Sequence, residues 1–210
     1  MHWLKYVYYG VMVLALLASL RGIKYRRYVL FIPLLALSLA VEITREFVSE
    51  EVAHYFNFFI AIEYTLLALI ISNFMHTASK RQVIRASIFV LVPLLILIQL
   101  LLAGNPAYKY LDLMIESPFL CAWTILYLFE TVKQEEEFEV TKNPMFWISL
   151  GNLLFFSGSF FSYGFGSYLE YKGNNHLADI IFWIARILNL LLYILYFIGF
   201  LCLGNRRSYT

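Results

Sequence analysis

Seven long apolar stretches constrain this chain more than any other feature of its sequence. They lie at residues 4–20, 28–48, 52–73, 83–103, 108–130, 144–166 and 177–203. A helix needs about 20 mainly apolar residues to cross the hydrocarbon core of a bilayer. Inside that core the backbone must satisfy its own hydrogen bonds, which apolar segments of this length do as helices. The sequence therefore predicts an all-α integral membrane bundle of seven transmembrane helices, with residues 1–210 forming a single domain.

The composition agrees with lipid as the solvent for most of the surface. The chain is 61% apolar and 14% charged, whereas about a quarter of the residues in a soluble domain are charged. Its formal net charge of +2 gives no reason to expect a nucleic-acid partner. Both cysteines, Cys121 and Cys202, fall in apolar stretches and are too few for a disulfide framework or a metal cluster.

The distribution of Lys and Arg predicts the orientation of the bundle. Eleven flank one side of the predicted membrane: Arg21, Lys24, Arg26, Arg27, Lys80, Arg81, Arg85, Lys133, Lys142, Arg206 and Arg207. Four flank the other side: Lys5, Arg45, Lys109 and Lys172. Since cytoplasmic loops carry the excess of Lys and Arg, we expect the N-terminus outside and the C-terminus in the cytoplasm. The first stretch is expected to remain as a helix, because its basic residues mainly follow it, unlike those of a signal peptide.

Polar side chains at membrane depth are the candidate functional residues, because a charge there needs a partner or a water-filled cavity. Seven are selected as candidate ligand-binding residues: Glu42, Asn57, Glu63, Glu116, Asn152, Arg186 and Asn189. In the predicted orientation the charged residues fall mainly in the outer half of the membrane, with Glu63 and Asn152 near its middle. Arg186 is the deeply placed cation of this set, and Glu63 and Glu116 are its expected counter-ions.

Acidic residues outnumber basic ones at this depth. An unpaired carboxyl group there would be protonated or would need a cation. The surplus favours an outward-facing polar pocket for a small molecule or a lipid. A buried ion pair that only fixes the register of the helices remains open as the structural alternative.

The sixth stretch is rich in small residues. Small residues recur at spacings near three, four and seven, which in membranes is typical of close packing between helices: Gly151, Ser157, Gly158, Ser159, Ser162, Gly164 and Gly166. A pocket wall is the alternative. Asn143 and Pro144 mark the start of this helix, since Asn is a favoured N-cap and Pro suits the first helical position.

Catalytic chemistry has weaker support in the sequence. Ser159 lacks a histidine at membrane depth that would activate it as a nucleophile. A weak zinc set consists of His54, His176 and Asp179, because His176 and Asp179 share one helix face and His54 is expected near the same surface. Polar residues at the membrane interface are the alternative interpretation. We expect no catalytic residues and no cofactor.

Three segments carry a resemblance to a known group of proteins: residues 57–64, 143–158 and 188–196. They resemble small, uncharacterised bacterial seven-helix membrane proteins that are often encoded beside sensor histidine kinases. The resemblance implies a sensory or regulatory module in the bacterial cytoplasmic membrane. It marks these residues as hallmarks of the group: Asn57, Glu63, Asn143, Pro144, Trp147, Gly151 and Asn189.

The leading functional hypothesis is a receptor-like or regulatory module embedded in the lipid bilayer. A small molecule or lipid would bind near Glu63, Glu116 and Arg186, and a shift in helix packing would reach a cytoplasmic or membrane signalling partner. One alternative is a transporter or proton-coupled carrier that uses Glu63, against which we count the few polar residues expected in the inner half. The other alternative is a zinc-dependent lipid-modifying membrane hydrolase.

Overall fold

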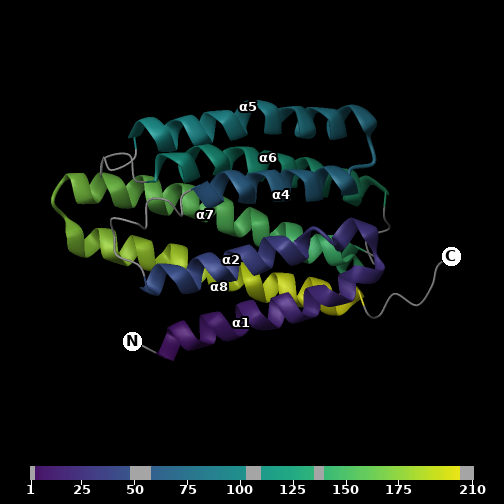
Figure 1. The fold of residues 1–210 in the computed structure, drawn as a ribbon, viewed down its shortest axis with the longest axis horizontal. Helices are drawn as coiled ribbons and strands as arrows, with labels where there is room; N and C mark the ends of the chain where they lie inside the picture. The colour runs from purple at the N-terminus through teal and green to yellow at the C-terminus, as the bar shows by residue number, and fades with distance from the viewer. Residues whose placement is uncertain (1–2, 48–57, 103–109, 135–139, 204–210) are drawn as a thin grey trace.

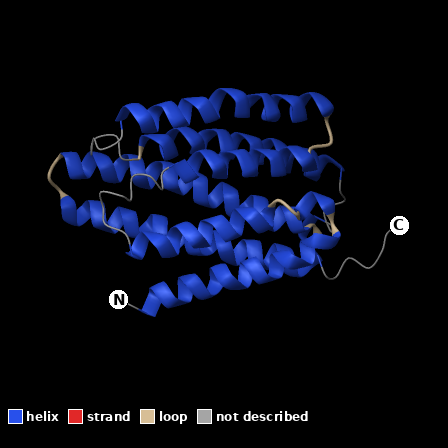
Figure 2. Ribbon diagram, viewed as in Figure 1, coloured by secondary structure: helices blue, strands red, loops and turns tan. Residues whose placement is uncertain are grey.

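The computed structural model describes residues 3–47, 58–102, 110–134 and 140–203, and these form helices. The α-helices are α1 (Trp3–Ser19), α2 (Phe31–Phe47), α4 (Phe58–Phe74), α5 (Ala78–Leu102), α6 (Leu111–Gln134), α7 (Pro144–Tyr171) and α8 (Asn175–Leu203). Three short 3-10 helices join them: η1 (Leu20–Lys24), η2 (Arg26–Tyr28) and η5 (Val140–Lys142). The described residues contain no strand (Figure 2). The all-α prediction is therefore confirmed.

Within the described residues, six segments are long and apolar enough to cross a membrane: Lys5–Lys24, Arg26–Arg45, Ala78–Leu102, Leu111–Lys133, Pro144–Tyr171 and Asn175–Leu203. The remaining apolar helix, α4, has 17 residues and a length of about 26 Å, somewhat less than the hydrocarbon core. Residues 52–57, which the sequence assigned to this helix, lie outside the described residues. The chain is thus a helical integral membrane protein with six candidate spanning helices and one shorter apolar helix.

The helices lie side by side along one common axis, and successive α-helices run in opposite directions (Figure 1). α1 and α5 lie at opposite edges of the bundle, and the other helices fill the space between them. α8 packs against α7 and α1, while α4 packs against α5, α6 and α2. The start of α1 and the end of α8 consequently lie at opposite ends of the bundle (Figure 1).

Glycines allow α7 and α8 to approach closely. A Cβ atom added to Gly151 would lie 3.2 Å from Leu195 Cβ, and one added to Gly166 would lie 2.5 Å from Phe182 Cε1. On α8, a Cβ atom at Gly199 would lie 2.8 Å from the carbonyl oxygen of Pro144. The close packing expected from the small residues is confirmed, because a larger side chain would force these helices apart.

The start of α7 follows from its own sequence. Asn143 has an extended backbone, and its side-chain oxygen accepts a hydrogen bond of 3.0 Å from Met145 N. Pro144 occupies the first turn, where its missing N–H costs no helical hydrogen bond. Trp147 Nε1 also donates to Thr141 O at 2.8 Å. These contacts hold the first turn of α7 against the preceding 3-10 helix, η5. The helix begins where Asn143 and Pro144 predicted.

Candidate functional site

One polar group joins α1, α2 and α8 in the half of the bundle where α1 begins. Asn189 Nδ2 donates a hydrogen bond of 2.8 Å to Tyr8 Oη. Tyr8 is also hydrogen-bonded to Glu42 and Tyr193, and Tyr193 is hydrogen-bonded to Ser38. Two of the residues selected from the sequence, Glu42 and Asn189, are therefore connected, and Tyr8 is the side chain that connects them.

A second polar group contains the acids of α4 and α6. Glu116 and Asp112 are buried, with 0% and 1% of their surface exposed. Asp112 accepts hydrogen bonds from Gln99 Nε2 and, at 2.8 Å, from Leu113 N. The charges of Glu63 and Asp112 act on Glu116. Three carboxyl groups thus share one region between α4, α5 and α6.

Arg45 connects these two groups electrostatically. It lies in the last turn of α2, and its charge acts on Glu63 and Asp112. Glu42, one turn earlier on α2, also acts on Glu63. We call the set Tyr8, Ser38, Glu42, Arg45, Glu63, Asp112, Glu116, Asn189 and Tyr193 the outer cluster. It contains four acids and one base, so its formal charge is negative when all of its groups are ionised.

Among the described residues, no ion pair joins Arg186 to the acids that were expected to pair with it. Its side chain is exposed, and its guanidinium carbon is 5.1 Å from the centroid of the Trp183 ring. The charge of Arg186 acts on Tyr163 of α7. Within the part of the chain that the structure describes, the cation that acts on Glu63 is Arg45. The sequence predicted that Arg186 pairs with Glu63, but in the structure the cation that acts on Glu63 is Arg45 at the end of α2.

Asn152 is connected to the outer cluster through a tyrosine of α8. Its side-chain oxygen accepts a hydrogen bond from Tyr196 Oη, and the charge of Glu63 acts on Tyr196. Ser159 lies seven residues after Asn152 and therefore on the same face of α7. The Ser159 hydroxyl is buried and has no hydrogen-bond partner among the described residues. This face of α7 thus presents polar groups at the depth of the acids.

The zinc set has no geometric support in the described residues. His176 and Asp179 are both exposed at the start of α8. His54 lies outside the described residues, as does Asn57, the remaining candidate ligand-binding residue. In the ranges that the structure describes, no group of three or more His, Cys, Asp or Glu side chains is arranged to hold a metal ion.

A buried polar face follows α6 along its whole length, and of its members only Glu116 had been selected from the sequence. Its members are Asp112, Glu116, Ser117, Thr124, Tyr127, Glu130 and Thr131, all of which are buried. Ser117, Thr124 and Thr131 recur every seven residues, a spacing that keeps side chains on one side of a helix. That spacing was the available signal. The half of the bundle where α6 ends accordingly buries more polar residues than the sequence led us to expect.

Several polar atoms on this face and on α7 lack partners. Both carboxyl oxygens of Glu116 and the hydroxyls of Thr124, Thr131 and Ser149 are buried, and no described residue hydrogen-bonds to them. By contrast, Tyr64 Oη of α4 lies 2.6 Å from Ser87 Oγ and accepts a hydrogen bond of 3.1 Å from Trp123 Nε1. Unpaired polar groups inside a protein are unusual, and ordered water or a bound ligand often satisfies them.

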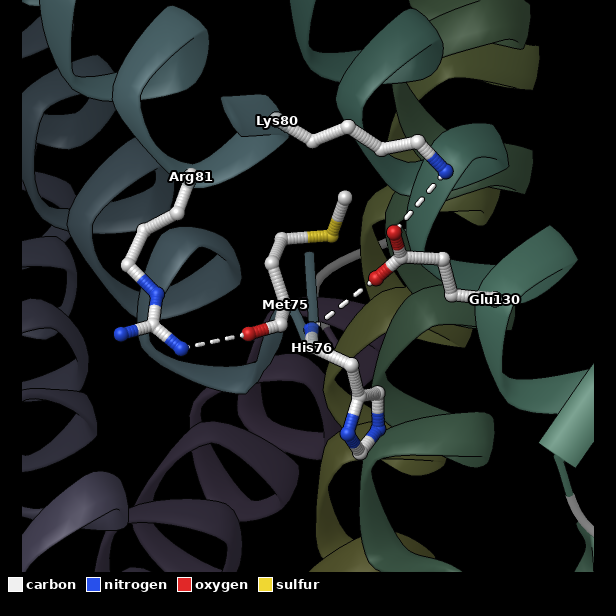
Figure 3. A network of polar contacts seen from close by, with 5 residues as sticks. All are labelled: Met75, His76, Lys80, Arg81 and Glu130. Carbon is white, nitrogen blue, oxygen red and sulfur yellow. Dashed lines mark hydrogen bonds and ion pairs between the residues drawn. The ribbon is translucent and has the colours of Figure 1, made fainter. Parts of the chain in front are cut away.

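An ion-paired acid occupies the other end of α6. Glu130 Oε1 lies 2.8 Å from Lys80 Nζ, and His76 N donates to Glu130 Oε2 at 3.0 Å (Figure 3). Beside them, Arg81 Nη2 donates to Met75 O at 2.8 Å. The carboxylate of Glu130 therefore lies at the N-terminus of α5, where a helix favours negative charge. This network joins α6 to the connection between α4 and α5.

Comparison with known protein families, curated proteins and solved structures finds no match. The functional argument therefore rests on the residues and on their arrangement.

Proposed function

We propose that this chain is a receptor-like or regulatory membrane module whose outer cluster binds a small molecule or a lipid. In this proposal the ligand reaches the cluster from outside and contacts Glu63 and Glu116. It then changes the packing of the helices that contribute to the cluster. A cytoplasmic or membrane signalling partner detects the change at the other end of the bundle.

The observation that supports this proposal most directly is the number of helices that meet in the outer cluster. Tyr8 connects α1 to α2 and α8, while Arg45 of α2 acts on acids of α4 and α6. A ligand that replaced any of these interactions would contact several helices at once. Its binding free energy would therefore depend on how those helices are placed relative to one another.

The proposal includes seven membrane crossings, with the N-terminus outside and the C-terminus in the cytoplasm, in a bacterial cytoplasmic membrane. The exposed basic residues of η1 and η2 support this orientation: Arg21, Lys24, Arg26 and Arg27. They lie at the end of the bundle where α8 ends, since η1 packs against both α1 and α8. α4 would form the shortest crossing, and its contacts with α2, α5 and α6 would shield it from much of the lipid.

A ligand screen on the full chain in lipid nanodiscs tests the proposal. Small amines, neutral metabolites and lipids are added separately, and a ligand at 100 times its Kd should stabilise the fold by about 2.7 kcal/mol in thermal unfolding. Glu63→Gln should remove most of this stabilisation. Glu170→Gln, which changes an exposed acid near the end of α7, should keep it. Equal responses of the two variants to every active ligand would contradict a role for the outer cluster.

A proton-coupled carrier is the second candidate, and the buried polar face of α6 favours it. A carrier needs polar groups that continue from the ligand site toward the opposite side of the membrane. Thr124 and Thr131 provide buried hydroxyls in that direction. A ligand that moves into proteoliposomes only under a proton gradient would support this candidate over the receptor-like one.

A further inference from the structure

We propose that Glu116 is a proton-binding group of the bundle, and that it exchanges its proton along the buried polar face of α6. Glu116 is completely buried, and neither of its carboxyl oxygens has a hydrogen-bond partner among the described residues. Asp112 lies one turn away and accepts two hydrogen bonds. A buried carboxylate without a donor or a cation carries a large cost in free energy. These surroundings therefore stabilise the neutral acid at position 116.

The neighbouring charges favour the same protonation state. Glu63 of α4 and Asp112 of α6 are both acids, and both act on Glu116. Arg45 of α2 acts on those two acids. From α5, the side-chain amide of Gln99 donates a hydrogen bond to Asp112. Acids that share one site cannot all ionise without repulsion. One proton bound to a carboxyl oxygen of Glu116 removes one negative charge from this group.

α7 carries further buried hydroxyls at depths that match those of the α6 residues. α6 and α7 run antiparallel (Figure 1), and their register follows from the close approach of Met114 to Gly164. A second contact, from Asn143 Nδ2 to Tyr127 Oη at 3.5 Å, agrees with it. This register puts Ser159 near the level of Glu116.

By the same register, Ser149 lies near the level of Thr124. The hydroxyls of Ser149, Ser159, Thr124 and Thr131 are buried without hydrogen-bond partners among the described residues. Internal water molecules usually satisfy such groups. Water and hydroxyl groups in sequence let a proton pass from one oxygen to the next.

Tyr64 of α4 lies between the levels of Glu116 and Thr124. Tyr64 is close enough to Glu116 for the two groups to interact electrostatically, and its hydroxyl is hydrogen-bonded to Ser87 and Trp123. In the proposed exchange, Glu116 receives one proton from the outer side and releases one proton toward Thr131. The number of protons is conserved, and no other bond is made or broken.

Infrared spectroscopy of the full chain in lipid nanodiscs at neutral pH tests the proton site. The wild-type spectrum should contain the C=O stretch of a protonated carboxyl group, and Glu116→Gln should remove that band. Glu130→Gln should keep it, because Glu130 is ion-paired with Lys80. Identical spectra for the wild type and Glu116→Gln would overturn the proposal. Loss of the wild-type band on addition of sodium at constant pH would identify a sodium site instead and would also overturn it.

Proton flux into proteoliposomes that contain a pH-sensitive dye tests the exchange. Glu116→Gln and Thr124→Val each remove one group of the proposed route. Each should slow the flux by about tenfold, which corresponds to about 1.4 kcal/mol in activation free energy. Thr65→Val is the matched control, because the Thr65 hydroxyl already donates to Ala61 O of its own helix at 2.7 Å. Wild-type flux in Thr124→Val would overturn the route along α6. Neither experiment uses a ligand, so failure of the ligand screen and failure of this inference are distinguishable.

Discussion

Glu116 and Glu130 lie on the same helix, are both buried, and have opposite surroundings. Glu130, with 5% of its surface exposed, has an ion pair to Lys80 and a backbone donor from His76. Glu116 has neither a cation nor a donor at its oxygens among the described residues. Burial alone therefore does not identify a functional acid. What separates the two residues is whether the fold supplies the carboxyl group with a cation and a hydrogen-bond donor. An acid with such partners stabilises the structure, whereas an acid without them remains available to a proton or a ligand.

The largest expected effect comes from neutralising each acid in turn. Glu130→Gln should lower the free energy of unfolding by about 2 kcal/mol, because it removes a charge-assisted contact at the start of α5. This value is modest because Lys80 is partly exposed and water screens the pair. Glu116→Gln should change it by less than about 0.5 kcal/mol, since the amide resembles the neutral acid. Denaturation of the purified chain in mixed micelles measures both values.

Two results would break this comparison. If the two variants lost equal stability, Glu116 would be part of the structural framework, as Glu130 is. If Glu130→Gln had no effect, the network at the start of α5 would contribute little to the fold.

A smaller effect is expected at the centre of the outer cluster. Tyr8→Phe removes the hydroxyl that connects Asn189 with Glu42 and should cost about 1 kcal/mol in the free energy of unfolding. Tyr6→Phe is the matched control on the same helix, because Tyr6 is 76% exposed. The same denaturation measurement applies. An equal response to both substitutions would show that the link through Tyr8 is not maintained in the folded protein.

The smallest effect is expected at Thr131, beside Glu130. Thr131→Val keeps the shape of the side chain and removes a buried hydroxyl without a hydrogen-bond partner among the described residues. It should change the free energy of unfolding by no more than about 0.5 kcal/mol, since no direct hydrogen bond is lost. A clear loss of stability would show that this hydroxyl has a direct hydrogen-bond partner in the folded protein. That result would mean that Thr131, like Glu130, already has a polar partner in the folded protein.

The sequence identified Glu116 of α6 but not its surroundings. Glu116 attracts notice because carboxyl groups are rare in an apolar segment. The pairing with Arg186 was expected for the same reason, since Arg186 lies deep in its helix. The structure instead brings Arg45 from the last turn of α2 to the acids. Depth along each helix can be estimated from sequence, but the rotation of one helix against another depends on how all their side chains pack.

The same limit explains why Tyr8 was missed. A tyrosine near the end of an apolar helix is common at the membrane interface, so its position carries no special signal. Its role comes from contacts with Glu42 and Asn189, and Asn189 is 181 positions away in the chain. The seven-residue spacing of Ser117, Thr124 and Thr131 was visible, but only the packing of α6 against its neighbours buries all three.

What the sequence determined by itself is the helical membrane architecture, because apolar length and the backbone's need for internal hydrogen bonds act locally on each segment. It also determined the start of α7 through Asn143 and Pro144, and the close approach of α7 to α8 through glycine. Only the tertiary structure decided which polar groups meet. It gave Glu130 an ion pair and left the carboxyl oxygens of Glu116 without a hydrogen-bond partner among the described residues, because pairing depends on side chains that other helices bring to each depth.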